Sequence, residues 1–179
     1  MPCLMSINAG GRHFADNPNL HSPRFLMHAI TDFMANDHRV CDAMLVKVEH
    51  AVTKHNWELA RSEFADYRDG MLHHFAAEES VLFPLFEQTT GMYRGPTQVM
   101  RGEHAQMRLL LTAAASALTA QDADDYAGNA ETLLIMMQQH NVKEENVLYP
   151  MCDQHLAHQV EALLPALQAQ IAGQLEVPT

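Results

Sequence analysis

The chain has 179 residues, the size of one domain, and it can bury a hydrophobic core without disulfides. Its net charge of −11 argues against nucleic acid and an anionic membrane surface as partners, because both repel an acidic protein. There is no charged-then-apolar leader and no apolar run of roughly 18 residues, so we expect neither a secretory signal nor a membrane span.

The expected elements are helices, because apolar residues recur at threes and fours and β-hairpin turn sequences are scarce. Residues 1–23 contain turn-forming Gly-Gly, Asn-Pro-Asn and Ser-Pro sequences and are expected to be an irregular N-terminal extension. Residues 24–153 are expected to form an all-α, up-down antiparallel four-helix bundle, since short connections make neighbouring helices antiparallel. The four helices are expected at residues 24–55, 57–87, 96–120 and 123–152.

Turn and cap residues support two of these boundaries. Pro96 follows Gly95 and suits the first position of the third helix, and Asp122 or a neighbour within residues 121–124 can cap the fourth. Residues 154–179 are expected to form a C-terminal helix and a tail. That helix is expected at residues 154–172, with Pro165 kinking it or resetting its start.

Two segments 66 positions apart are near copies of each other. Residues 74–84 read HFAAEESVLFP, residues 140–150 read HNVKEENVLYP, and six of the eleven positions are identical. The same offset relates Asp37-His38 to Glu103-His104. Each copy therefore contributes a single His and then, 36 residues later, a His-x-x-x-Glu.

The predicted turns bring these residues to one level of the bundle. Each candidate His is nearly equidistant from its neighbouring connections, so all of them lie roughly 20–27 Å from a bundle end. The i,i+4 spacing puts each Glu on the same helix face as its His. The predicted metal ligands are His38, His74, Glu78, His104, His140 and Glu144.

Four imidazoles and two carboxylates are too many for one tetrahedral zinc, and they suit two metal ions. Mixed imidazole and carboxylate ligation with open positions indicates iron first and manganese next, with zinc a possible occupant of the purified protein. Two His for each metal and two shared carboxylates leave positions for water, an oxo or hydroxo bridge, or a diatomic gas.

These residues, with Leu82-Phe83-Pro84 and Leu148-Tyr149-Pro150, resemble the hemerythrin-like HHE cation-binding domain family over about residues 25–155. The resemblance implies a four-helix bundle with a non-haem di-iron centre. It further implies that His38 and His74 hold one iron, that His104 and His140 hold the other, and that Glu78 and Glu144 bridge them.

The chain departs from the oxygen-carrying members at two places. Those proteins have a fifth His one turn after the third, where this chain has Arg108, and a His-x-x-x-x-Asp in the last helix, where it has Glu144 or Glu145. The pattern is closer to bacterial di-iron proteins linked to nitrosative stress and iron–sulfur cluster repair.

We therefore expect a cytoplasmic di-iron protein that binds or senses O2 or NO, or reports iron supply. The alternative is an enzyme or iron donor that acts on NO or peroxide or assists cluster repair, and a module that only holds iron is a third candidate. No catalytic residue is assigned. The protein partner, and the choice between monomer and homodimer, stay open.

Several residues near the predicted centre have two interpretations. Glu79 and Glu145 are expected to be solvated or inter-helix carboxylates, or else acceptors for a ligand imidazole N–H or switching ligands. Tyrosine hydroxyls are expected at the bundle surface, or else as donors to a bound oxygen species. This expectation covers Tyr67, Tyr126 and Tyr149.

Other residues are expected to have structural roles. The three cysteines are odd in number and have no Cys-x-x-Cys spacing, which favours reduced thiols. Cys41 is expected to fill the core, and His73 to be exposed. His155 and His158 are expected to be surface residues and not a second metal site. The other two cysteines are Cys3 and Cys152. Four methionines can line a dry pocket over the metals: Met44, Met107, Met136 and Met137.

Overall fold

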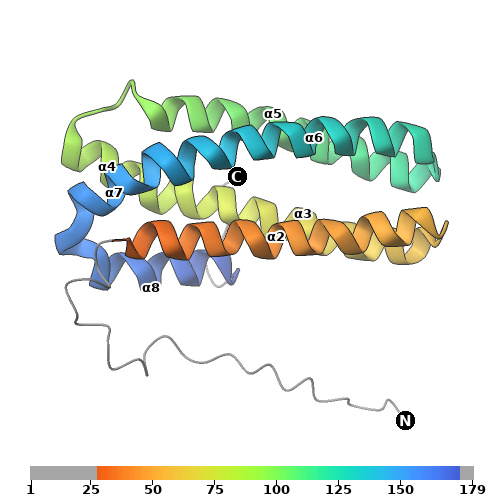
Figure 1. Ribbon diagram of the computed structural model, residues 1–179, viewed down its shortest axis with the longest axis horizontal. Coiled ribbons are helices and arrows are strands. Elements are labelled where there is room, and N and C mark those ends of the chain that lie inside the picture. Colours follow the sequence, from red (N-terminus) through yellow and green to blue (C-terminus); the bar gives the residue numbers. More distant parts are fainter. Residues whose placement is uncertain (1–27, 174–179) are drawn as a thin grey trace, which may run out of the picture.

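In this computed structural model, residues 28–173 are described, and their regular elements are all helical. Four long helices run alternately up and down in a bundle (Figure 1). They are α2 (Ala29–Thr53), α3 (Trp57–Ala77), α5 (Pro96–Ala120) and α6 (Ala123–Lys143). The predicted all-α bundle is confirmed.

Two of these helices continue through a π-helical turn into a further α-helix. α3 passes through η2 (Glu78–Leu82) into α4 (Phe83–Thr90), and α6 passes through η3 (Glu144–Leu148) into α7 (Tyr149–Leu156). A 3-10 turn, η4 (Ala157–Gln159), then leads into α8 (Val160–Ile171). α8 packs beside α2, α3 and η2 (Figure 1).

The π turns lie at the same place in both copies of the repeat. Pro84 and Pro150 lack an N–H, and in an α-helix their rings would clash with the carbonyl four residues earlier. The wider π turn avoids this clash, with the Phe83 N–H bonded to the Glu78 carbonyl and the Tyr149 N–H to the Glu144 carbonyl. In both copies a π turn therefore begins at the Glu of the His-x-x-x-Glu motif.

Cap residues set the helix starts. The Asn56 side chain accepts a hydrogen bond from the Leu59 N–H at the start of α3. At the start of α6, the Asp122 carboxylate accepts bonds from the Asp124 and Asp125 N–H groups, as predicted. The third helix begins at Pro96 and ends at Ala120, again as predicted.

Other predicted boundaries were wrong. The second helix runs on to Thr90, not 87, because Gly91 with φ 74 is the residue that ends it in the left-handed conformation. The fourth helix runs on to Leu156, not 152. Residues 154–156 therefore belong to α7, and the last helix starts only at Val160.

Pro165 lies inside α8 and neither resets its start nor ends it. It is near enough to the helix start that only the intrahelical bond to the Glu161 carbonyl is lost. The expected N-terminal extension, the predicted helix start at 24 and the end of the C-terminal tail lie outside the described residues.

The core consists of two hydrophobic clusters with the predicted ligand layer between them. One cluster, around Phe64, Tyr67 and Leu111, fills the end of the bundle where α2 meets α3 and α5 meets α6. The other, around Phe83 and Leu156, lies at the opposite end and includes the inner face of α8. The candidate site is therefore enclosed above and below by apolar side chains.

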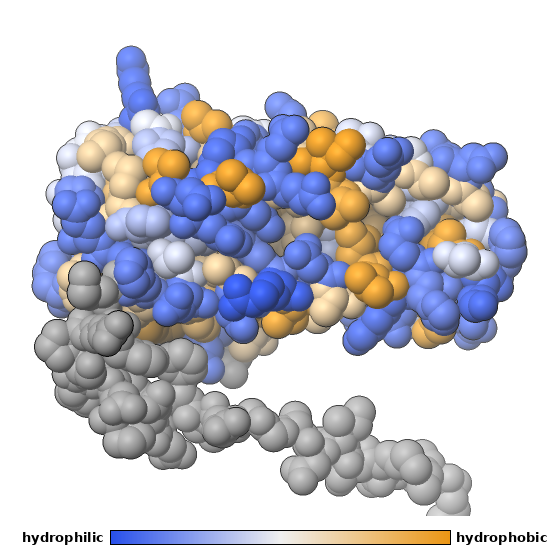
Figure 2. Space-filling view, viewed as in Figure 1, coloured by the Kyte–Doolittle hydropathy of each residue, from blue (hydrophilic) through white to orange (hydrophobic). Residues whose placement is uncertain are grey.

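The visible outer surface is mainly hydrophilic, with apolar residues scattered over it (Figure 2). Among residues 28–173, no helix combines the length and the apolar character needed to cross a bilayer.

Candidate metal centre

The structure brings the six predicted ligands together in the middle of the bundle. They come from α2, α3, η2, α5, α6 and η3, and none is more than 6% exposed. Two overlapping groups have potential ligand atoms within 4.8 Å of one another. The groups are Glu78, His104, His140 and Glu144, and His38, His74 and Glu144.

The four imidazoles form two pairs. The Nε2 atoms of His38 and His74 are 3.1 Å apart, and those of His104 and His140 are also 3.1 Å apart. Each pair joins neighbouring antiparallel helices, α2 with α3 and α5 with α6. Two equivalent sets of nitrogen ligands therefore face each other across the bundle.

The two buried carboxylates span these pairs. Oε2 of Glu78 lies 3.2 Å from Nε2 of His104 and 3.6 Å from Nε2 of His74. Glu144 directs Oε1 to His140 at 3.0 Å and Oε2 to His38 at 3.3 Å. Each carboxylate thus reaches one imidazole of each pair, which is the arrangement that two bridging ligands require.

A second carboxylate holds the outer nitrogen of every imidazole. Each Nδ1 lies 2.8 Å from a carboxylate oxygen on a different element. These contacts run in one direction round the bundle. A carboxylate on α2 contacts an imidazole on α3, one on η2 contacts α5, one on α5 contacts α6, and one on η3 contacts α2. The pairs are Asp37 with His74, Glu79 with His104, Glu103 with His140, and Glu145 with His38.

Glu79 and Glu145 are thus inter-helix carboxylates, as expected, and each is hydrogen-bonded to the imidazole of a candidate ligand. Asp37 and Glu103 have the same role, which sequence reasoning missed. The signal was present, because each directly precedes a candidate ligand and the 66-residue offset relates the two.

These outer bonds determine which atoms face the centre. An imidazole whose Nδ1–H donates to a carboxylate has a lone pair on Nε2. Two such lone pairs 3.1 Å apart repel each other unless a cation or a proton lies between them. Oε2 of Glu78 and Oε1 of Glu144 are also buried without a hydrogen-bond partner among the described residues. The donor set therefore fits bound metal.

The electrostatics of the centre also favour positive charge. Burial opposes protonation of the His38 imidazole, but the hydrogen bonds and charges of Glu144 and its neighbours outweigh this and raise its pKa to about 9. Burial of His104 is outweighed in the same way by Glu78 and Glu79, and its pKa is again about 9. Without metal the centre takes up protons, and metal ions would compete with them.

Tyr149 corrects an expectation. The sequence reading put its hydroxyl at the bundle surface, but the residue is fully buried. The hydroxyl lies 2.7 Å from Oε1 of Glu78, 2.9 Å from Oε2 of Glu144 and 3.3 Å from Nε2 of His38. Burial, followed by the charges of the two carboxylates, raises its pKa well above the usual range, so the hydroxyl keeps its proton and acts as a donor.

The surface expectation is wrong for the other two tyrosines as well. Tyr67 is buried, and its hydroxyl bonds to the Met137 sulfur at 2.9 Å. Tyr126 is buried with its hydroxyl 2.8 Å from Glu49. Neither contacts the predicted ligands, so their role is in packing.

Arg108 does not reach the centre directly. Its guanidinium donates two hydrogen bonds of 2.9 Å to Glu79 and lies over the Phe75 ring. Burial would raise the pKa of Glu79, but His104 and Arg108 together lower it to about 2. Arg108 is therefore linked to the His104 imidazole through a charged carboxylate.

The remaining predictions have mixed outcomes. Cys41 is a buried core residue, as predicted. His73 is half-buried next to Gly173 and not exposed, because the end of α8 covers it. His155 is half-buried against Phe86. Of the predicted methionine set, Met107 and Met137 are buried, and Met44 and Met136 are partly buried against the same cluster.

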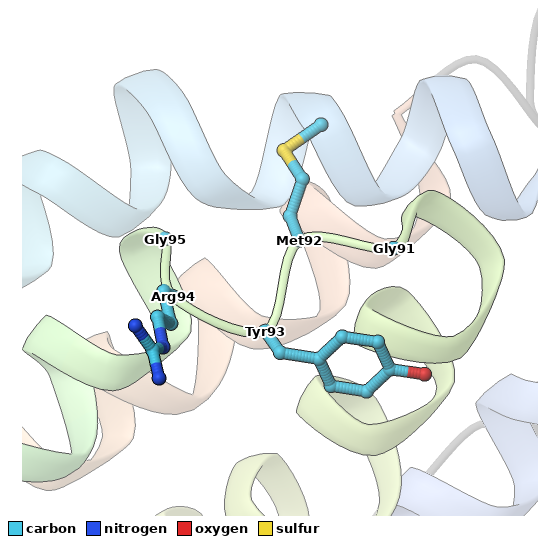
Figure 3. Close-up of a pocket in the computed structure, with 5 residues that line it drawn as sticks. All are labelled: Gly91, Met92, Tyr93, Arg94 and Gly95. Carbon is cyan, nitrogen blue, oxygen red and sulfur yellow. The ribbon is translucent and has the colours of Figure 1, made fainter.

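A separate recess lies at the end of the bundle, under the loop between α4 and α5 (Figure 3). Five consecutive loop residues, Gly91–Gly95, line it. None of the candidate ligands borders this recess, so it is not an entrance to the centre.

Fold and donor set together define a helical bundle built to hold cations. In agreement, the protein-family model described as hemerythrin HHE cation binding domain matches residues 29–152. The chain therefore belongs to the hemerythrin HHE cation-binding domain family. Searches of curated proteins and of solved structures gave no significant match.

Proposed function

We propose that this protein is a cytoplasmic non-haem di-iron protein that binds or senses a diatomic gas, O2 or NO, or reports iron supply. The observation that supports it best is the pairing of Nε2 atoms across the bundle, with Glu78 and Glu144 each reaching both pairs. Two cations can share this set with two imidazoles each.

The chemistry of the ligands supports iron. Imidazole and carboxylate together suit iron or manganese, and a purified sample can also contain zinc. With two imidazoles and two shared carboxylates per ion, each ion has fewer than six protein ligands. A reducible metal with such open positions supplies the capacity to bind a diatomic molecule or to change oxidation state.

The surroundings of the centre support a very small ligand. The six candidate ligands are almost fully buried, between two apolar clusters. Tyr149 supplies a hydroxyl that can turn from Glu78 or Glu144 to a polar ligand. The site thus combines a buried position between apolar clusters with a hydrogen-bond donor, which is enough to orient a diatomic molecule.

Charge and cysteine state support the remaining parts of the proposal. The net charge of −11 disfavours nucleic acid and anionic membrane partners. Cys41 and Cys152 are buried free thiols, in keeping with a reducing compartment.

The proposal is tested by optical spectroscopy of protein loaded with Fe(II) without oxygen, before and after addition of O2 and of NO. New absorption bands on exposure to either gas, which are lost in His74→Ala and kept in His158→Ala, are expected. His158 is an exposed histidine outside the cluster. Unchanged spectra with both gases would reject gas binding, and sustained consumption of NO or peroxide would replace it with the enzymatic alternative.

A further inference from the structure

The two halves of the centre differ in charge, although their ligands match. In the half that contains His104 and His140, both outer carboxylates have a cation partner. Arg108 donates two hydrogen bonds to Glu79, and Lys143 forms an ion pair with Glu103. The outer shell of this half therefore has two negative and two positive charges.

In the part of the chain that the structure describes, the half that contains His38 and His74 has no such cations. The residues 66 positions before Arg108 and Lys143 are Asp42 and Ala77. Among residues 28–173, no Lys or Arg forms an ion pair with Asp37 or Glu145. Among the described residues, the two negative charges of this half therefore have no lysine or arginine ion-pair partner.

The fold itself contributes to this difference. Ala77 is completely buried, and α8 packs against this part of α3 and η2. The equivalent position 143 on α6 is open enough for the Lys143 side chain to be 43% exposed. A lysine at position 77 would have to place its charge beneath α8, which is costly.

The difference in charge affects metal binding in two ways, and both weaken binding in the half that contains His104 and His140. A carboxylate that accepts an imidazole N–H makes that imidazole a stronger metal ligand, and a cation on the same carboxylate weakens the effect. Arg108 and Lys143 also repel an incoming cation through space. Glu78 and Glu144 do not affect the comparison, because each reaches both imidazole pairs.

We propose that the two halves bind divalent first-row metal ions in a fixed order. The half formed by His38 and His74 takes the first ion and holds it more tightly. The half formed by His104 and His140 takes the second ion and exchanges it more readily, with Arg108 and Lys143 as the residues that weaken it. This inference rests on the proposed two-metal function.

The test is a titration of metal-free protein with Co(II), followed by its optical absorption. The wild type is expected to bind in two steps whose affinities differ by about 10- to 100-fold, the range that outer-ligand changes produce. His74→Ala should lose the tight step and His140→Ala the weak step. These two variants are needed because two steps alone do not identify the tighter half: in any two-ion site the first bound ion weakens binding of the second.

The charge argument is tested with variants outside the ligand set. Arg108→Gln should strengthen the weak step by about tenfold and leave the tight step unchanged, whereas Arg108→Lys should behave like the wild type. The matched variant is Asp42→Arg, at an exposed position one helical turn from His38. It should weaken the tight step, because an arginine there can reach Glu145 as Arg108 reaches Glu79.

The outcomes separate this inference from the function on which it rests. If both Arg108→Gln and Asp42→Arg leave the two Co(II) affinities unchanged, the binding order is overturned but the proposed function is not. Loss of the tight step in His140→Ala would also overturn it. Failure of the folded wild-type protein to bind Co(II) at all would overturn both the proposed function and the binding order.

Discussion

The two copies of the repeat agree in the residues that determine geometry and differ in the residues that determine charge. Each copy has a single His, a His-x-x-x-Glu, a π turn and a proline at the same offset. Each imidazole has an outer carboxylate at the same distance. The cations and the tyrosine hydroxyl are distributed unequally between the halves. Arg108 and Lys143 pair with the outer carboxylates of one half, and Tyr149 lies next to His38 in the other.

The same contrast recurs at the end of the bundle near α4 and α7. Thr31 donates a hydrogen bond to Asp153, and Thr97 donates one to Glu87, and the offset of 66 relates these two pairs. Glu87 also pairs with Arg101, whereas the residue equivalent to Arg101 is Ala35. The duplicated fold therefore keeps its hydrogen bonds while the charge around them changes.

The largest expected effect comes from removing one imidazole. In His74→Ala and in His140→Ala, metal should stabilise the protein less than it stabilises the wild type, by about 3 kcal/mol at a metal concentration near 100 times the dissociation constant. Thermal unfolding with and without Fe(II) measures this difference. His158→Ala is the control, and an equal metal-dependent rise in melting temperature in all four proteins would contradict the assignment of the ligands.

Tyr149→Phe makes the second copy resemble the first, which has Phe83 at this position. Without metal, the loss of the hydroxyl deprives Glu78 and Glu144 of a donor and should cost about 2 kcal/mol of unfolding free energy. With metal bound, the carboxylates have another partner, so the cost should be smaller. Chemical denaturation in both states measures the two costs.

Tyr67→Phe is the matched control for that comparison, since Tyr67 is also buried but its hydroxyl bonds to the Met137 sulfur instead of a carboxylate. Its cost should be the same with and without metal. A cost of Tyr149→Phe that does not depend on metal would mean that the hydroxyl belongs to the packing and not to the centre.

The smallest expected effect concerns Glu87 and Asp153, whose pKa values shift in opposite directions. Arg101 holds the pKa of Glu87 below its ordinary 4.5, so its stabilising effect is present above pH 4.5 and is lost as the pH falls further. Burial raises the pKa of Asp153 above 3.8, so its contribution declines as the pH rises through that value.

The cost of Glu87→Gln, about 1 kcal/mol at neutral pH, should therefore shrink on acidification. The cost of Asp153→Asn should shrink as the pH rises. Denaturant unfolding of the metal-free variants at about pH 3 to 7 measures both trends. Parallel trends in the two variants would show that the Arg101 charge does not distinguish Glu87 from Asp153.

The sequence predicts the helices and the six candidate ligands because both depend on local periodicity. The i,i+4 spacing and the repeat offset bring His74 and Glu78 to the same level as His140 and Glu144 without any knowledge of packing. The Asp122 cap and the start at Pro96 are equally local.

The features that the sequence missed depend on how the helices are rotated against one another. Tyr149 faces the centre because the π turn at η3 changes the helical phase after Glu144, and no periodicity argument includes that turn. The roles of Asp37 and Glu103 depend on a ring of contacts between neighbouring helices. The burial of Tyr67 and Tyr126 likewise follows from packing in the cluster around Phe64.

The central claim is that the two imidazole pairs and the carboxylates between them hold two metal ions in one chain. Metal analysis of protein loaded with Fe(II) without oxygen, and then freed of unbound iron, tests it most directly. We predict two irons per wild-type chain and fewer in both His74→Ala and His140→Ala. One iron or none in the wild type, or unchanged iron in both variants, would contradict the claim.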